Sequence, residues 1–193
     1  MLTKDGCDMI AAMLCGKSVT LGPVLSVDFP SLFLWADDLE AARLNETYRP
    51  AVWKGQEDFW FNTGDDPSRV FFAIRKLGAS PIIGYVQITN IDAVHRSAII
   101  GLRIGDEANR GQGYGKDALR LAVDYCWKHL NLSRIGLVAF ETNRRAIRLY
   151  SALGFEQEGV LRRAVFIDGR WLDMVVMALL HPSRTNAPSL APA

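Results

Sequence analysis

Residues 110–116 read Arg-Gly-Gln-Gly-Tyr-Gly-Lys and constrain the fold of this chain more than any other stretch. An apolar, strand-like run precedes them at residues 99–104, and an amphipathic, helix-like run follows at residues 117–130. Glycine has no Cβ, so alternate glycines let several backbone N–H groups point at one anion beside the positive end of a helix. Arg110 and Lys116 add fixed positive charge. The stretch therefore predicts a strand, a phosphate-binding loop and a helix, with an ordinary glycine-rich turn as the alternative.

The apolar patterns on either side of this loop predict a mixed sheet. Three strands upstream should form an antiparallel meander, and the helix after the loop leads into a further strand, which makes a right-handed parallel crossover. The chain then closes with a hairpin whose turn is Asp168-Gly169. The expected strands span residues 19–21, 70–74, 82–88, 97–104, 134–140, 155–167 and 170–180. We therefore expect an α+β, three-layer fold with a mostly antiparallel sheet of about seven strands, flanked by helices, and one central parallel pair.

The remaining segments predict helices and flexible ends. Residues 29–45 have helical spacing with Asp28 as a candidate N-cap, and residues 56–62 predict a short helix rich in aromatic side chains. Thr142 or Asn143 should cap the helix that follows the parallel pair. The expected organisation is an N-terminal extension over residues 1–17, a single domain over residues 18–180 and a flexible tail over residues 181–193.

Composition excludes several classes of protein. With 22 Lys and Arg against 21 Asp and Glu, the formal net charge is +1, and nothing favours nucleic acid as a partner. Cys7, Cys15 and Cys126 are odd in number and lack Cys-x-x-Cys spacing, which disfavours a disulfide framework and a zinc site, so we expect reduced thiols and no metal. No apolar run approaches the roughly 18 residues of a membrane span, and residues 9–14 lack the pattern of a signal peptide. We expect a soluble, cytoplasmic monomer or homodimer.

Spacing separates the possible phosphate ligands of the loop. A Walker loop would need glycine where Arg110 stands and a hydroxyl where Asp117 stands. A dinucleotide fingerprint would need an alternating strand–helix series, whereas three antiparallel-looking strands precede this loop. Both readings are disfavoured.

The pattern Arg-x-x-Gly-x-Gly, formed by Arg110, Gly113 and Gly115, resembles the acetyl-coenzyme A loop of the GNAT superfamily of N-acetyltransferases. The similarity continues in order and spacing through the following helix and strand to residues 143–155, and is strong from about residue 85 to residue 180 but weak before that. Within the superfamily, residues 158–161 (Glu-Gly-Val-Leu) followed by residues 166–169 (Phe-Ile-Asp-Gly) resemble the branch that contains ribosomal-protein N-terminal acetyltransferases and spermidine acetyltransferases.

This resemblance implies a binding site for acetyl-coenzyme A. The pyrophosphate would lie on the N–H groups of residues 111–115. The pantetheine arm would run like an added strand beside Leu102 and Ile104, where two strands splay apart. The expected cofactor-binding residues are Leu102, Arg103, Ile104, Arg110, Gly111, Gln112, Gly113, Tyr114, Gly115, Lys116, Asn143 and Arg148.

The resemblance also implies direct attack of a primary amine on the thioester in a ternary complex, without a metal. The tyrosine matching Tyr150 protonates the leaving thiolate in this family, although its place in the apolar stripe of a helix also fits core packing. The backbone N–H at Ile104 would stabilise the oxyanion. Glu141 is the candidate base, with Asp173 and His95 as alternatives on the acceptor side; each of these groups also fits a solvated surface position.

The acceptor itself stays open. Trp35, Trp53 and Trp60 are candidates for lining its pocket, with packing of a small core as the alternative. Residues 95–98 are followed by Ile99, where many relatives carry a glutamate that faces the acceptor, and this weakens a polyamine acceptor. An amino sugar, an amino-acid-like amine and a protein N-terminus remain, beside a non-catalytic acyl-coenzyme A binding module of the same fold.

Overall fold

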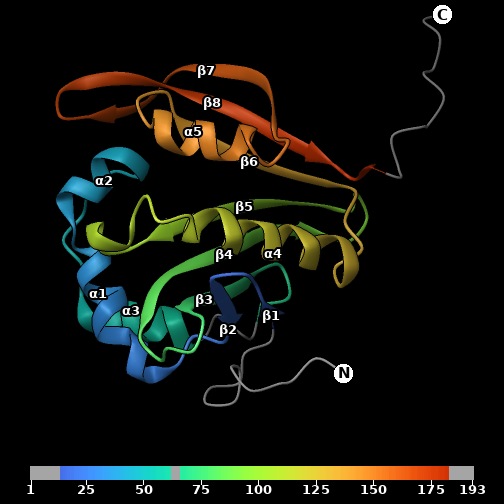
Figure 1. Cartoon of the computed structure of the whole chain (residues 1–193). Helices are drawn as coiled ribbons and strands as arrows, with labels where there is room; N and C mark the ends of the chain where they lie inside the picture. Colours follow the sequence, from blue (N-terminus) through green and yellow to red (C-terminus); the bar gives the residue numbers. More distant parts are fainter. Residues whose placement is uncertain (1–13, 62–65, 183–193) are drawn as a thin grey trace, which may run out of the picture.

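The computed structural model describes residues 14–61 and 66–182, which form one eight-stranded sheet flanked by helices (Figure 1). The strands are β1 (Leu14–Cys15), β2 (Val19–Gly22), β3 (Val70–Lys76), β4 (Ile82–Asp92), β5 (Ser97–Ile104), β6 (Arg134–Phe140), β7 (Glu156–Ile167) and β8 (Arg170–Leu180). The helices are α1 (Phe29–Ala36), α2 (Leu39–Asn45), α3 (Trp53–Phe61), α4 (Tyr114–Lys128) and α5 (Arg144–Ser151), with 3-10 helices η1 (Ser26–Asp28) and η3 (Glu107–Asn109). Most of the expected N-terminal extension and C-terminal tail lies outside the described residues.

The strand order is β1-β2-β3-β4-β5-β6-β8-β7, and every neighbouring pair is antiparallel except β5 and β6. α4 makes the crossover between these two parallel strands, as the sequence predicts. The predicted fold class is confirmed. The short edge strand β1 accounts for eight strands where about seven are expected, because two residues carry no readable alternation.

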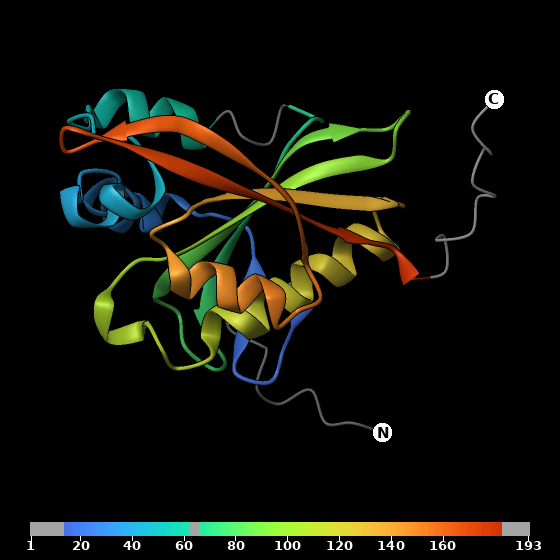
Figure 2. The same cartoon turned by 90° about the horizontal axis from the view of Figure 1, so that it is seen from above.

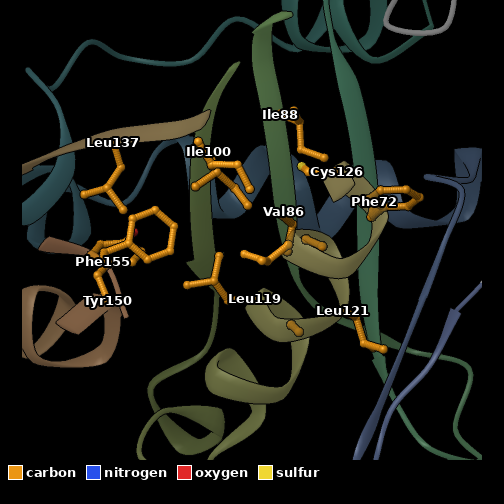
Figure 3. Packing of buried hydrophobic residues seen from close by; sticks show 14 of the residues in the cluster. Phe72, Val86, Ile88, Ile100, Leu119, Leu121, Cys126, Leu137, Tyr150 and Phe155 are labelled. Carbon is orange, nitrogen blue, oxygen red and sulfur yellow. The ribbon is translucent and has the colours of Figure 1, made fainter. Parts of the chain in front are cut away.

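Helices cover both faces of the sheet (Figure 2). α4 and α5 lie on one face, where apolar side chains such as Leu119, Val86 and Leu137 form the main core (Figure 3). A second, smaller core on the other face packs α1 and α3 against β3 and β4 through residues such as Leu32 and Trp60. β3 and β4 therefore bury side chains on both faces of the sheet.

The start of α4 is anchored to β2 by the buried carboxylate of Asp117. This group accepts hydrogen bonds from the backbone N–H groups of Ser18 (2.7 Å) and Val19 (3.3 Å) and from the Arg120 guanidinium (3.1 Å). Burial alone would raise the pKa of Asp117, but these hydrogen bonds outweigh it and hold the pKa below its usual value. The anchor fixes the helix that follows the glycine loop.

The predicted single helix over residues 29–45 is two helices, so that expectation is wrong in detail. Asp38 begins the second, because its Oδ1 accepts a hydrogen bond from the N–H of Ala41 (3.1 Å). Asp28 does not cap the first with its side chain. Its carboxylate instead forms a buried ion pair with Arg75, at 2.6 Å, which ties the chain before α1 to β3.

Two other expectations have definite outcomes. The turn Asp168-Gly169 joins β7 to β8 with φ angles of +47° and +76°, which the predicted hairpin turn requires. Cys126 is free and buried, but Cys15 forms a disulfide bond, so the expectation of reduced thiols is wrong at that residue.

In the part of the chain that the structure describes, no helix combines the length and apolar character needed to cross a membrane.

Candidate active site

The glycine loop joins β5 to α4 through η3. Gly111 and Gly113 have φ angles of +79° and +84°, a left-handed conformation that glycine adopts without strain. Gly113 is the residue before α4, which begins at Tyr114. A Cβ on Gly115 would lie 3.1 Å from Leu102 Cδ2, so glycine at this position lets the helix N-terminus lie directly against β5.

Arg110 closes the base of this loop. Its Nε donates to the carbonyl oxygen of Ile104 (3.2 Å), and its Nη2 donates to that of Gly105 (2.5 Å). The Arg110 guanidinium therefore lies at the base of the glycine loop, where the sequence predicts a positive charge. It is held by backbone carbonyls at the end of β5, which fixes the path of the chain into η3.

The parallel strands β5 and β6 pair only at their beginnings. Their register ends at Ile99 and Gly136, after which β5 stays paired with β4 and β6 with β8. Backbone groups alternate in direction along a strand. Since the N–H of Gly105 donates to β4, those of Leu102 and Ile104 face the gap on the β6 side. This edge can accept an extended ligand as an added strand.

A cleft of about 270 Å³ lies beside this edge, and we call it the β5–α5 cleft. The glycine loop, the end of β5, α5 and α2 form its walls. The expected residues that line it are Leu102, Arg103, Ile104, Arg110, Gly111, Gly113, Gly115, Asn143 and Tyr150. Four other expected residues, Gln112, Tyr114, Lys116 and Arg148, lie beside the cleft without lining it. Of these, Gln112, Lys116 and Arg148 are exposed.

Arg145 also lines the β5–α5 cleft, although the resemblance does not single it out. One Nη atom lies 3.8 Å from where a Cβ on Gly111 would stand. Residues four apart share one face of a helix, so Arg145 faces the same way as the cleft-lining Leu149. This spacing is the signal that identifies Arg145 in place of Arg148 as the cation on the cleft side of α5.

Asn143 uses both ends of its amide. The Oδ1 atom accepts from the N–H of Ala146 (3.1 Å) and caps α5, while Nδ2 donates to the carbonyl of Leu44 (3.2 Å) at the end of α2. The capping role is as expected. The second bond holds α2 against the cleft.

Tyr150 lies in α5 with only 7% of its surface exposed. Its ring packs against Phe155 with centroids 5.8 Å apart, and Figure 3 shows both near Leu137. Burial raises the pKa of Tyr150 to about 12. The phenol therefore stays protonated at every ordinary pH, and because Tyr150 also lines the cleft, both its packing and its predicted role as a proton donor fit its position.

Two further cavities continue from the cleft to the other face of the sheet. A connecting cavity of about 160 Å³ shares Leu102, Arg103 and Tyr150 with the β5–α5 cleft. It shares Tyr85, Gln87 and Arg103 with an aromatic cavity of about 610 Å³ beneath α1–α3. The connecting cavity thus lies between the other two. Tyr150 borders both the β5–α5 cleft and the connecting cavity, and Arg103 borders all three spaces.

The three tryptophans named from the sequence lie in different environments. Trp60 lines the aromatic cavity. Trp35 is buried in the second core, where its Nε1 donates to Asp106 (3.1 Å), and lines none of the three cavities. Trp53 is 44% exposed and packs against Phe33. Of these three tryptophans, only Trp60 lines one of the three cavities.

The candidate bases lie outside the three cavities. Glu141 accepts a hydrogen bond from the N–H of Asp173 (3.3 Å), and Asp173 accepts one from the N–H of Arg163 (2.8 Å), so both carboxylates organise the region between β6 and the β7–β8 hairpin. His95 lies in the β4–β5 turn, at the opposite end of β5 from Ile104. The structure does not bring these residues together with Tyr150.

Two residues line the connecting and aromatic cavities although the sequence does not predict them there. Glu46, directly after α2, pairs with Arg103 at 3.2 Å, and both line the connecting and aromatic cavities. Arg103, which the sequence predicts at the cofactor, lines the β5–α5 cleft as well, and its side chain points to the α1–α3 face together with its cross-strand neighbour Tyr85. Burial raises the pKa of Tyr85, although the Arg103 guanidinium opposes the change.

Comparison with known proteins gives one consistent family. The family model described as an acetyltransferase (GNAT) domain matches residues 18–156. The spermidine N(1)-acetyltransferase of Vibrio cholerae is 35% identical over 105 residues, which are 54% of this chain and 60% of that protein. The ribosomal protein uS5-alanine N-acetyltransferase of Escherichia coli is 28% identical over 137 residues, 70% of each chain.

Solved structures share the fold. A crystal structure of the Vibrio cholerae spermidine N-acetyltransferase in complex with CoA and spermine has a TM-score of 0.77 at 26% identity, covering 84% of this chain and 95% of that one. Mycobacterium smegmatis RimJ in complex with CoA-disulfide has a TM-score of 0.75 at 23% identity, covering 89% and 88%. Sequence alignment thus spans only about three fifths of the Vibrio protein, whereas structural alignment spans nearly all of it.

Proposed function

The chain belongs to the GNAT acetyltransferase family, and on that premise we propose that it transfers an acetyl group from acetyl-coenzyme A to a primary amine. The observation that carries the proposal is the series of three cavities. One end meets the glycine loop and the open edge of β5, the other end is a large aromatic cavity, and Tyr150 lies between them. A donor and an acceptor can therefore approach the same tyrosine from opposite sides.

The donor would occupy the β5–α5 cleft. The N–H groups of residues 111–115 at the start of α4 would receive the pyrophosphate, because helix N-termini favour anions, and Arg145 would add charge from α5. The pantetheine arm would pair with the backbone of Leu102 and Ile104 in the way that a peptide adds to a sheet edge. The thioester would then lie near Tyr150.

The chemistry requires only proton transfers and one acyl transfer. The neutral amine attacks the thioester carbonyl and forms the N–C bond, with the N–H of Ile104 donating to the oxyanion. The C–S bond then breaks, the amine nitrogen gives up its proton to a base, and the thiolate takes the proton of Tyr150, which is later replaced from solvent. A protonated phenol is available because burial keeps it un-ionised.

Two carboxylates are candidates for the base that accepts the proton of the amine. Glu141 stays a prediction, and its carboxylate is engaged by the backbone of Asp173. Glu46 supplies the carboxylate in the lining of the aromatic and connecting cavities, as far as the described residues go. It is 56% exposed, so a water molecule could carry the proton from the amine to it.

The test begins with binding and proceeds to turnover. Acetyl-coenzyme A and coenzyme A should raise the thermal midpoint, whereas ATP and NAD should not. Tyr150→Phe should lower kcat by about 100- to 10,000-fold while the Kd for coenzyme A stays unchanged; Tyr125→Phe on α4 is the matched control and should leave kcat as it is. Equal loss of affinity and turnover in Tyr150→Phe would instead show a packing role.

The extent of the domain, the compartment and the oligomeric state follow from the same proposed function. The acetyltransferase domain would span residues 18–180, since β7 and β8 complete the sheet beyond the family match. The site of action would be the cytoplasm, where thiol titration of freshly extracted protein should find Cys15 reduced; a disulfide at Cys15 that persists in the extract would instead indicate an oxidising compartment. We expect a monomer or homodimer, although one solved Vibrio cholerae relative is described as dodecameric, and light scattering would measure the mass.

A further inference from the structure

A buried cation lies where the acceptor would bind. Arg103 is 9% exposed and lines all three cavities. Its Nη1 pairs with Glu46 at 3.2 Å, and its Nη2 donates to the carbonyl of Trp35. The guanidinium also interacts with the Tyr85 hydroxyl, through its charge and a side-chain hydrogen bond that oppose the rise that burial causes in the pKa of that phenol, whereas its Nε–H has no hydrogen-bond partner in the part of the chain that the structure describes. One buried donor of a charged group is thus left over at the junction of the cavities.

An unpaired donor of this kind is costly. A buried polar group without a partner loses its hydration without compensation, and an arginine cannot lose its proton to avoid the cost. By contrast, the other buried arginine, Arg75, pairs all three of its donor positions, with Ser80, Pro23 and Asp28. The difference between the two arginines indicates that Arg103 is completed by a ligand atom that accepts a hydrogen bond.

The charges around the acceptor cavities favour an anionic group. Among the described residues that line the connecting and aromatic cavities, the charged ones are Glu46, Arg49 and Arg103. Glu46 is already paired with Arg103. Each protonated amine of a bound polyamine would need a carboxylate or several acceptors to replace its hydration, and this lining supplies no second carboxylate.

We propose that the acceptor is a small primary amine that carries a carboxylate a few bonds from the amine, as an apolar α-amino acid does, and that Arg103 Nε binds this carboxylate. The inference rests on the proposed acetyl transfer. The short spacing follows from the connecting cavity, where Arg103 and Tyr150 border the same 160 Å³. The apolar side chain would enter the aromatic cavity, whose walls include Phe59, Trp60 and Phe71.

The first arm of the test compares acids with their amides on the full-length protein. L-leucine, L-methionine and L-phenylalanine are each assayed for thiol release from acetyl-coenzyme A beside the matching carboxamides and spermidine. We expect kcat/KM to be about 10- to 100-fold higher for an amino acid than for its amide, as for loss of a charge-assisted hydrogen bond. Faster turnover of the amides, of spermidine or of a leucine-initiated peptide amide overturns the proposal.

The second arm assigns the effect to the residue. Arg103→Gln should reduce the preference for acid over amide to about 2-fold or less without a matching loss of coenzyme A affinity. Arg69→Gln removes an arginine that pairs with Asp66 three residues before it and lines none of the three cavities, so it should keep the preference. Arg103→Lys retains the charge and serves if the glutamine variant does not fold. An unchanged preference in both Arg103 variants overturns the assignment.

The third arm needs no turnover. With coenzyme A bound, N-acetyl-leucine should raise the thermal midpoint of the wild-type protein more than N-acetyl-leucinamide does, because only the acid carries the carboxylate. Equal shifts overturn the inference even if none of the amines is acetylated. Failure of coenzyme A itself to shift the midpoint would instead overturn the proposed acetyl transfer.

Discussion

Removing the carboxylate of Asp28 should destabilise the fold by about 3–5 kcal/mol, which is the usual cost of leaving one partner of a buried ion pair uncompensated. Asp28 and Arg75 are each 3% exposed. The Oδ2 atom of Asp28 accepts from Arg75 at 2.6 Å and from the N–H of Leu25 at 2.8 Å. Two hydrogen bonds to a charged group, at about 1.5–3 kcal/mol each, give about 3–6 kcal/mol, which overlaps this range.

Further variants distinguish the loss of the charge from the loss of the side chain that carries it. Asp28→Asn keeps an acceptor without the charge and should cost less than Asp28→Ala. The double variant Asp28→Leu/Arg75→Met removes both charges and should lie within about 2 kcal/mol of the wild type, since an apolar pair avoids the desolvation of two ions. Asp38→Ala is the control. It removes an aspartate that caps α2, and should cost about 1 kcal/mol.

Urea unfolding, followed by circular dichroism and by tryptophan fluorescence, measures these differences if the two signals coincide and the m-value is constant. A total stability of about 5–15 kcal/mol leaves room for a folded single variant. A cost below about 1 kcal/mol for Asp28→Ala refutes the reasoning. So does a double variant that is as unstable as the sum of the single variants.

Three further predictions concern other parts of the fold. Gly115→Val should cost about 1–3 kcal/mol and weaken coenzyme A binding, because its Cβ would press on Leu102; calorimetric titration and a melting curve measure both effects, and unchanged binding would contradict it. Asn143→Ala should cost about 1 kcal/mol through the lost cap of α5, read by thermal melting; a cost near zero would show that the cap is dispensable. Burial raises the pKa of Cys126 from 9.0 to about 12 and that of Tyr150 from 10.0 to about 12. The folded chain therefore holds protons that the unfolded chain releases, so the urea midpoint should fall as pH rises from 9 toward 12, and a flat midpoint would contradict it.

The second half of the chain is readable because its signals are local. The bounds of β6 agree with the predicted residues 134–140, since an apolar run between a helix and a capped helix leaves little choice. The loop conformation follows from glycines at 111 and 113, and the hairpin turn from Asp168-Gly169. Each of these features depends on residues within one turn or one strand.

The lining of the connecting and aromatic cavities could not be predicted from the sequence, because it depends on contacts between residues that are far apart along the chain. Arg103 looks like one residue of a cofactor strand, and alternation shows only that it faces away from Leu102. That it meets Glu46 and the carbonyl of Trp35 depends on contacts 57 and 68 residues apart along the chain. The ion pair of Asp28 and Arg75, 47 residues apart, likewise overrides the local signal for a helix cap.

The contacts that hold α2 in place restrict the order in which the protein folds during translation. Leu44 is held by Asn143, 99 residues later, and Arg43 by Asp168 in the β7–β8 turn at 2.6 Å, so the hairpin reaches across to the α1–α3 end (Figure 2). On the ribosome, α2 leaves the exit tunnel long before either partner has been translated. The part of the β5–α5 cleft wall that α2 forms is thus fixed only after both partners have been translated, and a nascent chain that ends at the glycine loop cannot yet have a closed cleft.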